Sequence, residues 1–341
     1  MDEVFERLQS AVEVMFELRQ FLLYRLAVYA GMAAVVVGYW IVVFVIHLLL
    51  SKIFESLGTI FILLAVVGNY GLFYVARSML LYTVQAGYVA VLTQALSGGL
   101  APGADQKAIA KQMVSERFSD VAMLAVADQL IRGTVSAFSR NVEDMAGWVP
   151  IPGMHQLLAL VNAVVGRAVN TINEAVLSLV FMRRDQPTWQ TVREGVVLYA
   201  GAWKPVLKLS AGLVVLDFLC TPLVFVMLLM VIGMPTVVLF THVQLLRGLA
   251  LVIPFVLTYL IRQVLFEPLA VTAVVIAFHR AIKGQTVDPS LEEKLALVAP
   301  QFQQIVLKAE GAGGAPAAPA ASGATAAPQR PRQRPGGLKK P

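Results

Sequence analysis

Three polar side chains, Asn69, Asp217 and Arg262, interrupt long apolar stretches of the chain. An amide, a carboxylate or a guanidinium is costly inside a bilayer, so each is expected to have a partner or a function there. Counted along helices, Asn69 and Asp217 lie about 12 Å, and Arg262 about 10 Å, from the cytoplasmic ends of their predicted spans. This shared depth predicts an ion pair between Asp217 and Arg262, with Asn69 within hydrogen-bonding reach.

The predicted polar group has two interpretations, and the sequence leaves both open. In the structural one, the ion pair and the amide fix how the helices pack. In the functional one, they line a polar pocket or a proton path that is reached from the cytoplasm. Glu267, just over one turn beyond Arg262, could extend either arrangement, although a carboxylate that snorkels to the interface is the simpler interpretation.

Two further patterns carry polar groups. The run Gly68-Asn69-Tyr70-Gly71 could unwind a helix as at transporter binding sites, or its glycines could serve close helix packing. In 155–182 several polar residues interrupt an apolar stretch, and most of them recur at helical spacing. That face is too polar for lipid, which predicts an interfacial or re-entrant helix with its polar side toward water or protein. The polar residues of this stretch are Asn162, Arg167, Asn170, Asn173 and Glu174.

Nothing in the sequence indicates catalysis. The four histidines are scattered, without a spacing typical of metal ligands, and there is no glycine-rich phosphate loop or nucleophile elbow. We therefore expect no catalytic residue, no metal site and no cofactor, and we do not expect an enzyme.

The elements that position these residues are long apolar helices. Of 341 residues, 58% are hydrophobic and 14% charged, whereas soluble domains carry about a quarter charged residues. The stretches 26–50 and 57–76 contain no charge, 209–232 contains only Asp217, and a fourth stretch starts at 249. Because about 20 apolar residues span a bilayer, the chain is predicted to be an all-α integral membrane protein with about four transmembrane helices.

Basic residues suggest the orientation. Lys and Arg gather before 26, in 77–208 and after 261, and the two remaining loops hold only Lys52 and Arg247. Because cytoplasmic loops carry the excess of Lys and Arg, both termini are predicted in the cytoplasm of a multi-pass protein, in a bacterial inner membrane. The start Met1-Asp2-Glu3 does not resemble a cleavable signal. Whether 78–100 prolongs the second span, crosses alone or lies along the interface stays open.

The predicted organisation follows from these patterns. Residues 1–25 form an amphipathic helix, and 26–100 hold spans one and two with an apolar extension. A cytoplasmic or interfacial helical region covers 101–208, including a helix over 105–146 that Asp105 caps. Spans three and four with a kinked interfacial extension cover 209–283, and 284–310 is a cytoplasmic helix. Residues 311–341 are predicted to be a disordered Ala/Pro/Gly-rich tail.

The basic end of that tail could contact lipid headgroups or a partner, or could be idle. It comprises Arg330, Arg332, Arg334, Lys339 and Lys340.

Two functions fit the pattern. The first is a non-enzymatic membrane scaffold or assembly component that oligomerises or docks partners through its cytoplasmic-side amphipathic helices. The alternative is a transporter or channel subunit for a small solute or ion with a polar intramembrane site. The expected partners are membrane lipids and further copies or another membrane protein, and nucleic acid is not expected. The sequence names no substrate, partner or process.

Overall fold

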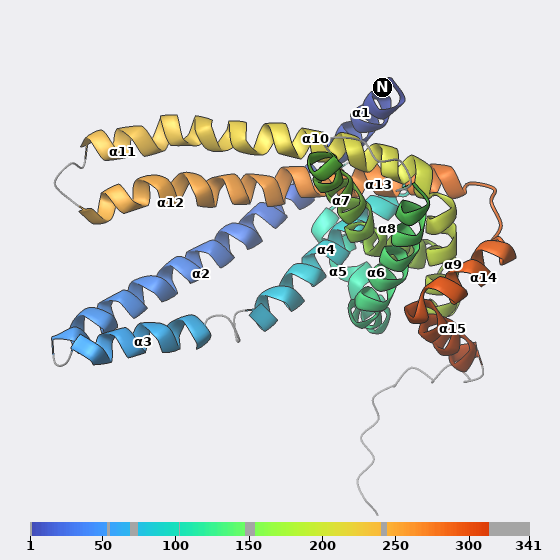
Figure 1. The fold of residues 1–341 in the computed structure, drawn as a ribbon, viewed down its shortest axis with the longest axis horizontal. Helices are drawn as coiled ribbons and strands as arrows, with labels where there is room; N and C mark the ends of the chain where they lie inside the picture. Colours follow the sequence, from blue (N-terminus) through green and yellow to red (C-terminus); the bar gives the residue numbers. More distant parts are fainter. Residues whose placement is uncertain are drawn as a thin grey trace, which may run out of the picture.

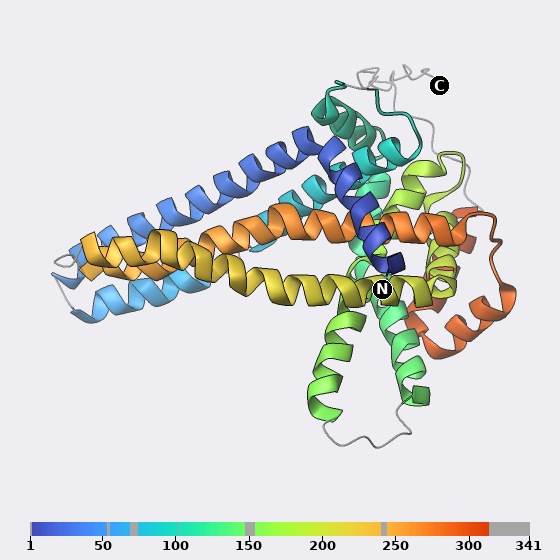
Figure 2. The ribbon, with the colours of Figure 1, turned by 90° about the horizontal axis from the view of Figure 1, so that it is seen from above.

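The computed structural model describes residues 2–52, 55–68, 74–101, 103–146, 154–239 and 244–313. Within these residues every regular element is helical. Figures 1 and 2 show two long helical hairpins that project to the same side of a body made of shorter helices. The fold therefore separates into apolar projections and a compact part.

The first hairpin pairs α2 (Arg19–Ser51) with α3 (Glu55–Gly68). Val43 and Ala65 are buried between the two helices, and the Tyr39 hydroxyl donates to the Ala65 carbonyl at 2.8 Å. Gly58 allows a close approach, because a Cβ there would meet the His47 ring at 2.8 Å. Most other apolar side chains of this hairpin are exposed.

The second hairpin starts with α10 (Trp203–Leu228), which continues through a π-helical turn (Leu229–Gly233) into α11 (Met234–Leu239). The chain returns through α12 (Gln244–Ile261) and a π-helical turn at Arg262–Phe266. Many large apolar side chains on its outer surface are exposed. Phe218 is 77% exposed and Leu239 is 74% exposed.

Among the described residues, four helices are long and apolar enough to span a membrane: Arg19–Ser51, Val161–Met182, Trp203–Leu239 and Val252–Ile282. The number agrees with the four spans predicted from the sequence, but one member differs. The predicted span 57–76 falls on α3 and continues into residues outside the described part. Val161–Met182 is instead mostly buried inside the body.

The body has one continuous apolar core. Its centre is formed by α8 and α13, whose residues 175–181 and 268–278 are buried without a gap. These helices are apolar on every side, so other helices must surround them. The helices of the body are α1 (Asp2–Glu17), α4 (Tyr74–Leu96), α5 (Gln106–Glu116), α6 (Phe118–Ala146), α7 (Met154–Asn170), α8 (Ile172–Met182), α9 (Thr188–Gly201), α13 (Glu267–Ile282), α14 (Pro289–Val298) and α15 (Pro300–Gly313).

Several predicted elements differ from the observed ones. The interfacial extension expected after Pro268 is wrong, because α13 lies in the core of the body. The interfacial or re-entrant helix over 155–182 is also corrected: it breaks near Thr171 into α7 and α8, and α8 is buried in protein. The undecided stretch 78–100 belongs to the body, where Val84 and Val89 are buried.

Helix ends follow local chemistry. The Asp105 carboxylate accepts hydrogen bonds from the backbone N–H groups of Lys107 and Ala108, as the predicted cap requires. The helix it begins ends at Glu116, and α6 continues after Arg117. Asp288 caps α14 in the same way, and its hydrogen bonds from Ser290 hold the pKa of that carboxyl below its ordinary value. The helix predicted over 284–310 is two helices, α14 and α15.

Candidate functional site

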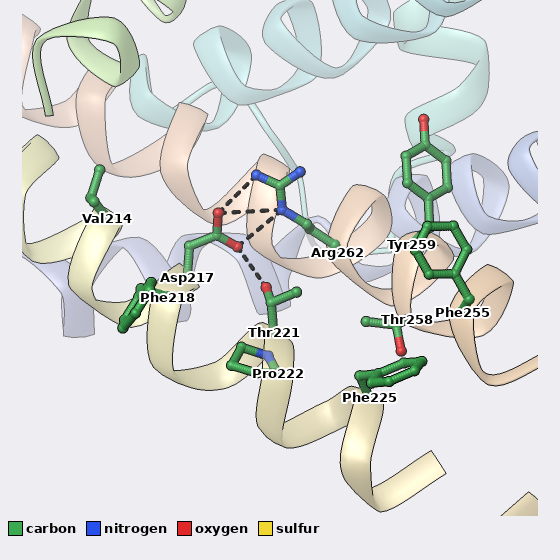
Figure 3. A pocket seen from close by; sticks show the side chains of 10 residues that line it. All are labelled: Val214, Asp217, Phe218, Thr221, Pro222, Phe225, Phe255, Thr258, Tyr259 and Arg262. Atoms are coloured by element: carbon green, nitrogen blue, oxygen red, sulfur yellow. Dashed lines mark hydrogen bonds and ion pairs between the residues drawn. The ribbon is translucent and has the colours of Figure 1, made fainter. Parts of the chain in front are cut away.

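Asp217 of α10 and Arg262 at the end of α12 form an ion pair (Figure 3). The Arg262 Nη2 donates to Asp217 Oδ2 at 2.8 Å, and Nε donates to Oδ1 at 3.0 Å. The Thr221 hydroxyl donates to the same Oδ1 at 2.8 Å. The bidentate contact joins the two legs of the second hairpin, and one turn of α10 supplies a further donor to the carboxylate.

The pair lies in a cleft of about 680 Å³ between α10 and α12, which we call the hairpin cleft. Asp217 and Arg262 are both partly exposed, so the charged groups can be reached from the side of the hairpin. The remaining walls are almost entirely apolar. They comprise Val214, Phe218, Thr221, Pro222, Phe225, Phe255, Thr258 and Tyr259.

Each of the two helices beside the cleft contains a proline. Pro222 lies inside α10 and has no N–H, so the carbonyl of Phe218 loses its usual helical donor. Pro254 lies inside α12, and the Thr258 hydroxyl donates to its carbonyl at 2.8 Å. Arg262 begins a π-helical turn, a feature that is frequent at functional sites. The cleft can therefore accept an apolar group beside one neutralised charge pair.

Glu267 forms a contact that the sequence did not predict. Its Oε2 accepts from Arg167 Nη1 of α7 at 2.8 Å, in a partly buried ion pair. The pair joins α7 to the first turn of α13. Arg167 belongs to the polar stretch 155–182, and Glu267 belongs to the predicted intramembrane group. No contact between these two groups was predicted from the sequence.

The other residues of that stretch do not form one continuous face. The Asn170 Oδ1 accepts from Arg132 Nη1 of α6 at 2.8 Å, at the surface. Asn173 is buried and donates to the Tyr82 hydroxyl at 3.4 Å. Asn162 is exposed. The predicted polar face is thus divided between solvent, an ion pair and the protein interior.

A buried polar group that the sequence did not reveal contains Arg25 of α2. This side chain is 1% exposed, and its Nη1 donates to Gln85 Oε1 of α4 at 2.6 Å. Gln85 in turn donates to Glu174 Oε1 of α8 at 3.4 Å. The guanidinium lies over the rings of Tyr29 and Tyr88, at 5.4 and 5.8 Å from their centroids.

This Arg25 group joins three helices where the first hairpin leaves the body. Two of its atoms, Arg25 Nε and Glu174 Oε2, are buried without a hydrogen-bond partner in the described part of the protein. The sequence treated Arg25 as a charge flanking the first span. The one available signal was Tyr29 at the i+4 position, a spacing at which ring and guanidinium can meet.

Some predicted residues lie outside the described part of the chain: Asn69 and the tail residues Arg330, Arg332, Arg334, Lys339 and Lys340. Among the described residues, no three His, Cys, Asp or Glu side chains gather closely enough to hold a metal ion. Comparison of the chain with protein-family models, curated proteins and solved structures finds no match. The case for a function therefore rests on the geometry of the two hairpins, the ion pair between Asp217 and Arg262, and the Arg25 group.

Proposed function

We propose that the chain is a non-enzymatic, multi-pass membrane scaffold whose two hairpins cross the bilayer and hold the helical body against one face of it. The observation that carries this proposal is the exposure of the hairpins' apolar side chains, such as Phe218 and Leu239. Each buried Å² of such surface contributes roughly 25 cal/mol, so lipid or another protein must cover it.

The lengths of the hairpins fit a bilayer. Tyr29 is the last residue of α2 buried in the body, and the helix continues about 33 Å to Ser51. In the second hairpin, α10 leaves the core at Leu213 and reaches Leu239 after about 39 Å. Both exceed the ~30 Å hydrocarbon thickness. The described part of the return leg α3 covers about 21 Å. We propose that the four legs of the two hairpins make four crossings, with both tips on the far side.

This arrangement changes the depth assigned to the ion pair. Asp217 lies about 33 Å from Leu239 along the helix, and Arg262 lies about 27 Å from Gln244. With the tip at the far edge of the hydrocarbon, the pair lies near the edge next to the body. The sequence placed it deeper, because it started span three at residue 209, which is buried in the body.

The body is proposed to face the cytoplasm of a bacterial inner membrane. Most basic residues belong to it, whereas Lys52 and Arg247 lie near the tips. The first and last described helices, α1 and α15, both contribute to its core. Both termini are therefore assigned to the cytoplasmic side.

The polar contacts support packing more than transport. Within the described part of the hairpins, Asp217 and Arg262 are the one ion pair, and they neutralise each other. The walls around them are apolar, and no residue of α2 or α3 lines the hairpin cleft. A transporter in one chain needs polar groups from several spans, which the described residues do not bring together here.

The proposed scaffold offers surfaces for assembly in two places. In the described residues the main contact between the hairpins is where α2 meets α12 and the π-helical turn beside it, which leaves their sides for neighbours in the membrane. Figure 2 shows that the end of α6 and the start of α7 extend together away from the body. A further copy or another membrane protein can meet the chain at either surface.

The mass of the assembled protein tests this function. We expect membranes cross-linked before mild-detergent extraction to yield particles heavier than one 36.9 kDa chain, containing further copies or a defined partner. A strict monomer without a partner contradicts the scaffold.

The double variant D217N/R262M separates the scaffold from a transporter, because it removes both charges while keeping similar volumes. We expect the assembly to persist with this variant. An ion conductance across reconstituted bilayers that D217N/R262M abolishes, in protein that remains folded, favours the transporter instead.

A further inference from the structure

A second cleft lies on the body, between the first turns of α2, the middle of α4 and helix α5. We call it the α5 cleft, and its volume is about 400 Å³. Its floor is mainly apolar, with Phe21, Val84 and Val114 among the lining residues. Gly87 leaves space at this floor, because a Cβ at this position would lie 3.1 Å from Phe21 Cζ. The cleft is therefore shaped to receive an apolar group.

The rim of the α5 cleft is basic. Lys107, Lys111 and Ser115 follow one another at intervals of four residues, so they share one face of α5 beside the cleft. Neither ammonium group forms an ion pair within the described residues, although Lys107 Nζ lies 5.5 Å from the centroid of the Tyr24 ring. Two unneutralised cations thus stand beside an apolar floor.

The carboxylates at the two ends of α5 are engaged elsewhere. Asp105 accepts from backbone N–H groups at the start of α5, and Glu116 accepts from Gln112 at 2.7 Å. No Asp or Glu lines the α5 cleft in the described structure. In the hairpin cleft, by contrast, Asp217 neutralises Arg262. Of these two clefts, the α5 cleft has a net positive charge and the hairpin cleft does not.

Its position relative to the bilayer rests on the proposed function. Tyr24 lies about 40 Å along α2 from Ser51, and a bilayer with its headgroups measures about 40–45 Å. Leu23 and Leu26, on the same turns of α2, are exposed and continue the apolar surface of the first hairpin. The α5 cleft therefore lies at the level of the headgroups on the body side.

We propose that the α5 cleft is a binding site for one anionic phospholipid. The headgroup phosphate pairs with Lys107 and Lys111, and the upper part of an acyl chain covers the floor around Phe21 and Val114. Charge and depth both select this occupant: a phosphate satisfies the two ammonium groups, and only a lipid at this level brings an apolar chain with it.

Titration of the full-length protein in mild detergent, followed by native mass spectrometry, tests the site. We expect K107Q/K111Q to weaken phosphatidylglycerol binding about 30-fold, which corresponds to ~1 kcal/mol for each lysine near the phosphate. Binding of phosphatidylcholine, which has no net charge, is expected to change little. Glycerol phosphate, which lacks acyl chains, is expected to bind far more weakly than the lipid.

Two further variants serve as controls. K204Q/K208Q removes the same charge at the same spacing from exposed positions of α10 and is expected to leave phosphatidylglycerol binding unchanged. S115W fills the mouth of the α5 cleft while keeping both lysines and is expected to abolish the tight binding. The proposal is overturned if the two lysine pairs have equal effects, if S115W binds normally, or if glycerol phosphate binds as well as the lipid.

Failure of this site is distinguishable from failure of the proposed function. If the protein inserts in membranes but K107Q/K111Q leaves lipid binding unchanged, the α5 cleft is not a lipid site and the scaffold stands. If the protein is released from membranes by high salt or alkaline washing, the hairpins do not span the bilayer and both proposals fall.

Discussion

Arg25 holds a charge inside the body, at the point where α2 becomes the first leg of a hairpin. A buried guanidinium is tolerated only when its environment replaces water, and here Gln85 and two tyrosine rings do so. Through Gln85 the group also reaches Glu174 of α8. A single side chain thus connects the base of the hairpin to the centre of the body.

Replacing Arg25 by Ala is expected to lower the free energy of unfolding by about 3 kcal/mol, because it leaves the Gln85 Oε1 without its donor and opens a cavity. The shift in the thermal unfolding midpoint of the full-length protein in mild detergent measures this loss.

Arg19→Ala is the matched control, because Arg19 lies on the same helix with its side chain exposed, and it is expected to change stability by less than about 0.5 kcal/mol. Equal effects of the two substitutions would show that the contacts of Arg25 add no stability.

At this scale the sequence predicts some contacts and misses others. The pairing of Asp217 with Arg262 follows from counting residues along helices, because opposite charges in apolar surroundings have few other partners. The contact between Arg167 and Glu267 does not follow, because it depends on how α7 packs against the first turn of α13. Arg25 was hidden because a charge at the end of an apolar stretch normally lies in water.

Gly58 shows how one position sets the geometry of a whole element. A Cβ there would lie 2.7 Å from Ser51 Oγ and 2.8 Å from His47 Nδ1, so α3 and α2 touch near the tip of the first hairpin. Near the other end of α3, Gly68 has no atom within 4 Å of its Cβ position. The two glycines therefore have different roles on the same helix.

Substitution of Gly58 by Leu is expected to push α3 away from α2 and to destabilise the first hairpin by about 1–3 kcal/mol. Gly68→Leu carries the same change in helix propensity without the clash and is expected to be neutral or stabilising. The thermal unfolding midpoint of each variant measures the difference. A Gly58→Leu protein as stable as Gly68→Leu would contradict the close approach.

Element ends were harder to predict than element types. Asp105 predicts the start of its helix as an N-cap, and the observed hydrogen bonds confirm this cap. No proline or glycine marks the breaks at Arg117 and Leu18. The helical periodicity of the sequence therefore predicted one continuous helix across each break. α13 was predicted to be an interfacial extension of span four, because a helix buried in protein and one at or in a membrane can have a similar apolar composition.

At the scale of the whole molecule, the proposed arrangement predicts that the hairpin tips and the body lie on opposite sides of the membrane. In a Cys220→Ser background, a single cysteine at position 52 is expected to react with a membrane-impermeant maleimide from outside the cell. One at position 185, an exposed turn of the body, is expected to react only after the cells are opened.

A cysteine at position 219, an exposed apolar position of α10 that we propose to face lipid, is the control and is expected to react from neither side. Positions 52 and 185 labelled from the same side would contradict four crossings with the body on one face, whichever face that is.

The core of the body draws on both ends of the chain, since α1 contacts α13, and α15 contacts α6 and α9. During synthesis, both hairpins are made before α13 and α15. The apolar faces of the early helices therefore stay incompletely buried until the last helices have been synthesised. Biogenesis of this protein is thus expected to finish with the closure of the body after both hairpins have entered the membrane, and truncation before residue 267 should leave an inserted but unfinished chain exposed to proteolysis.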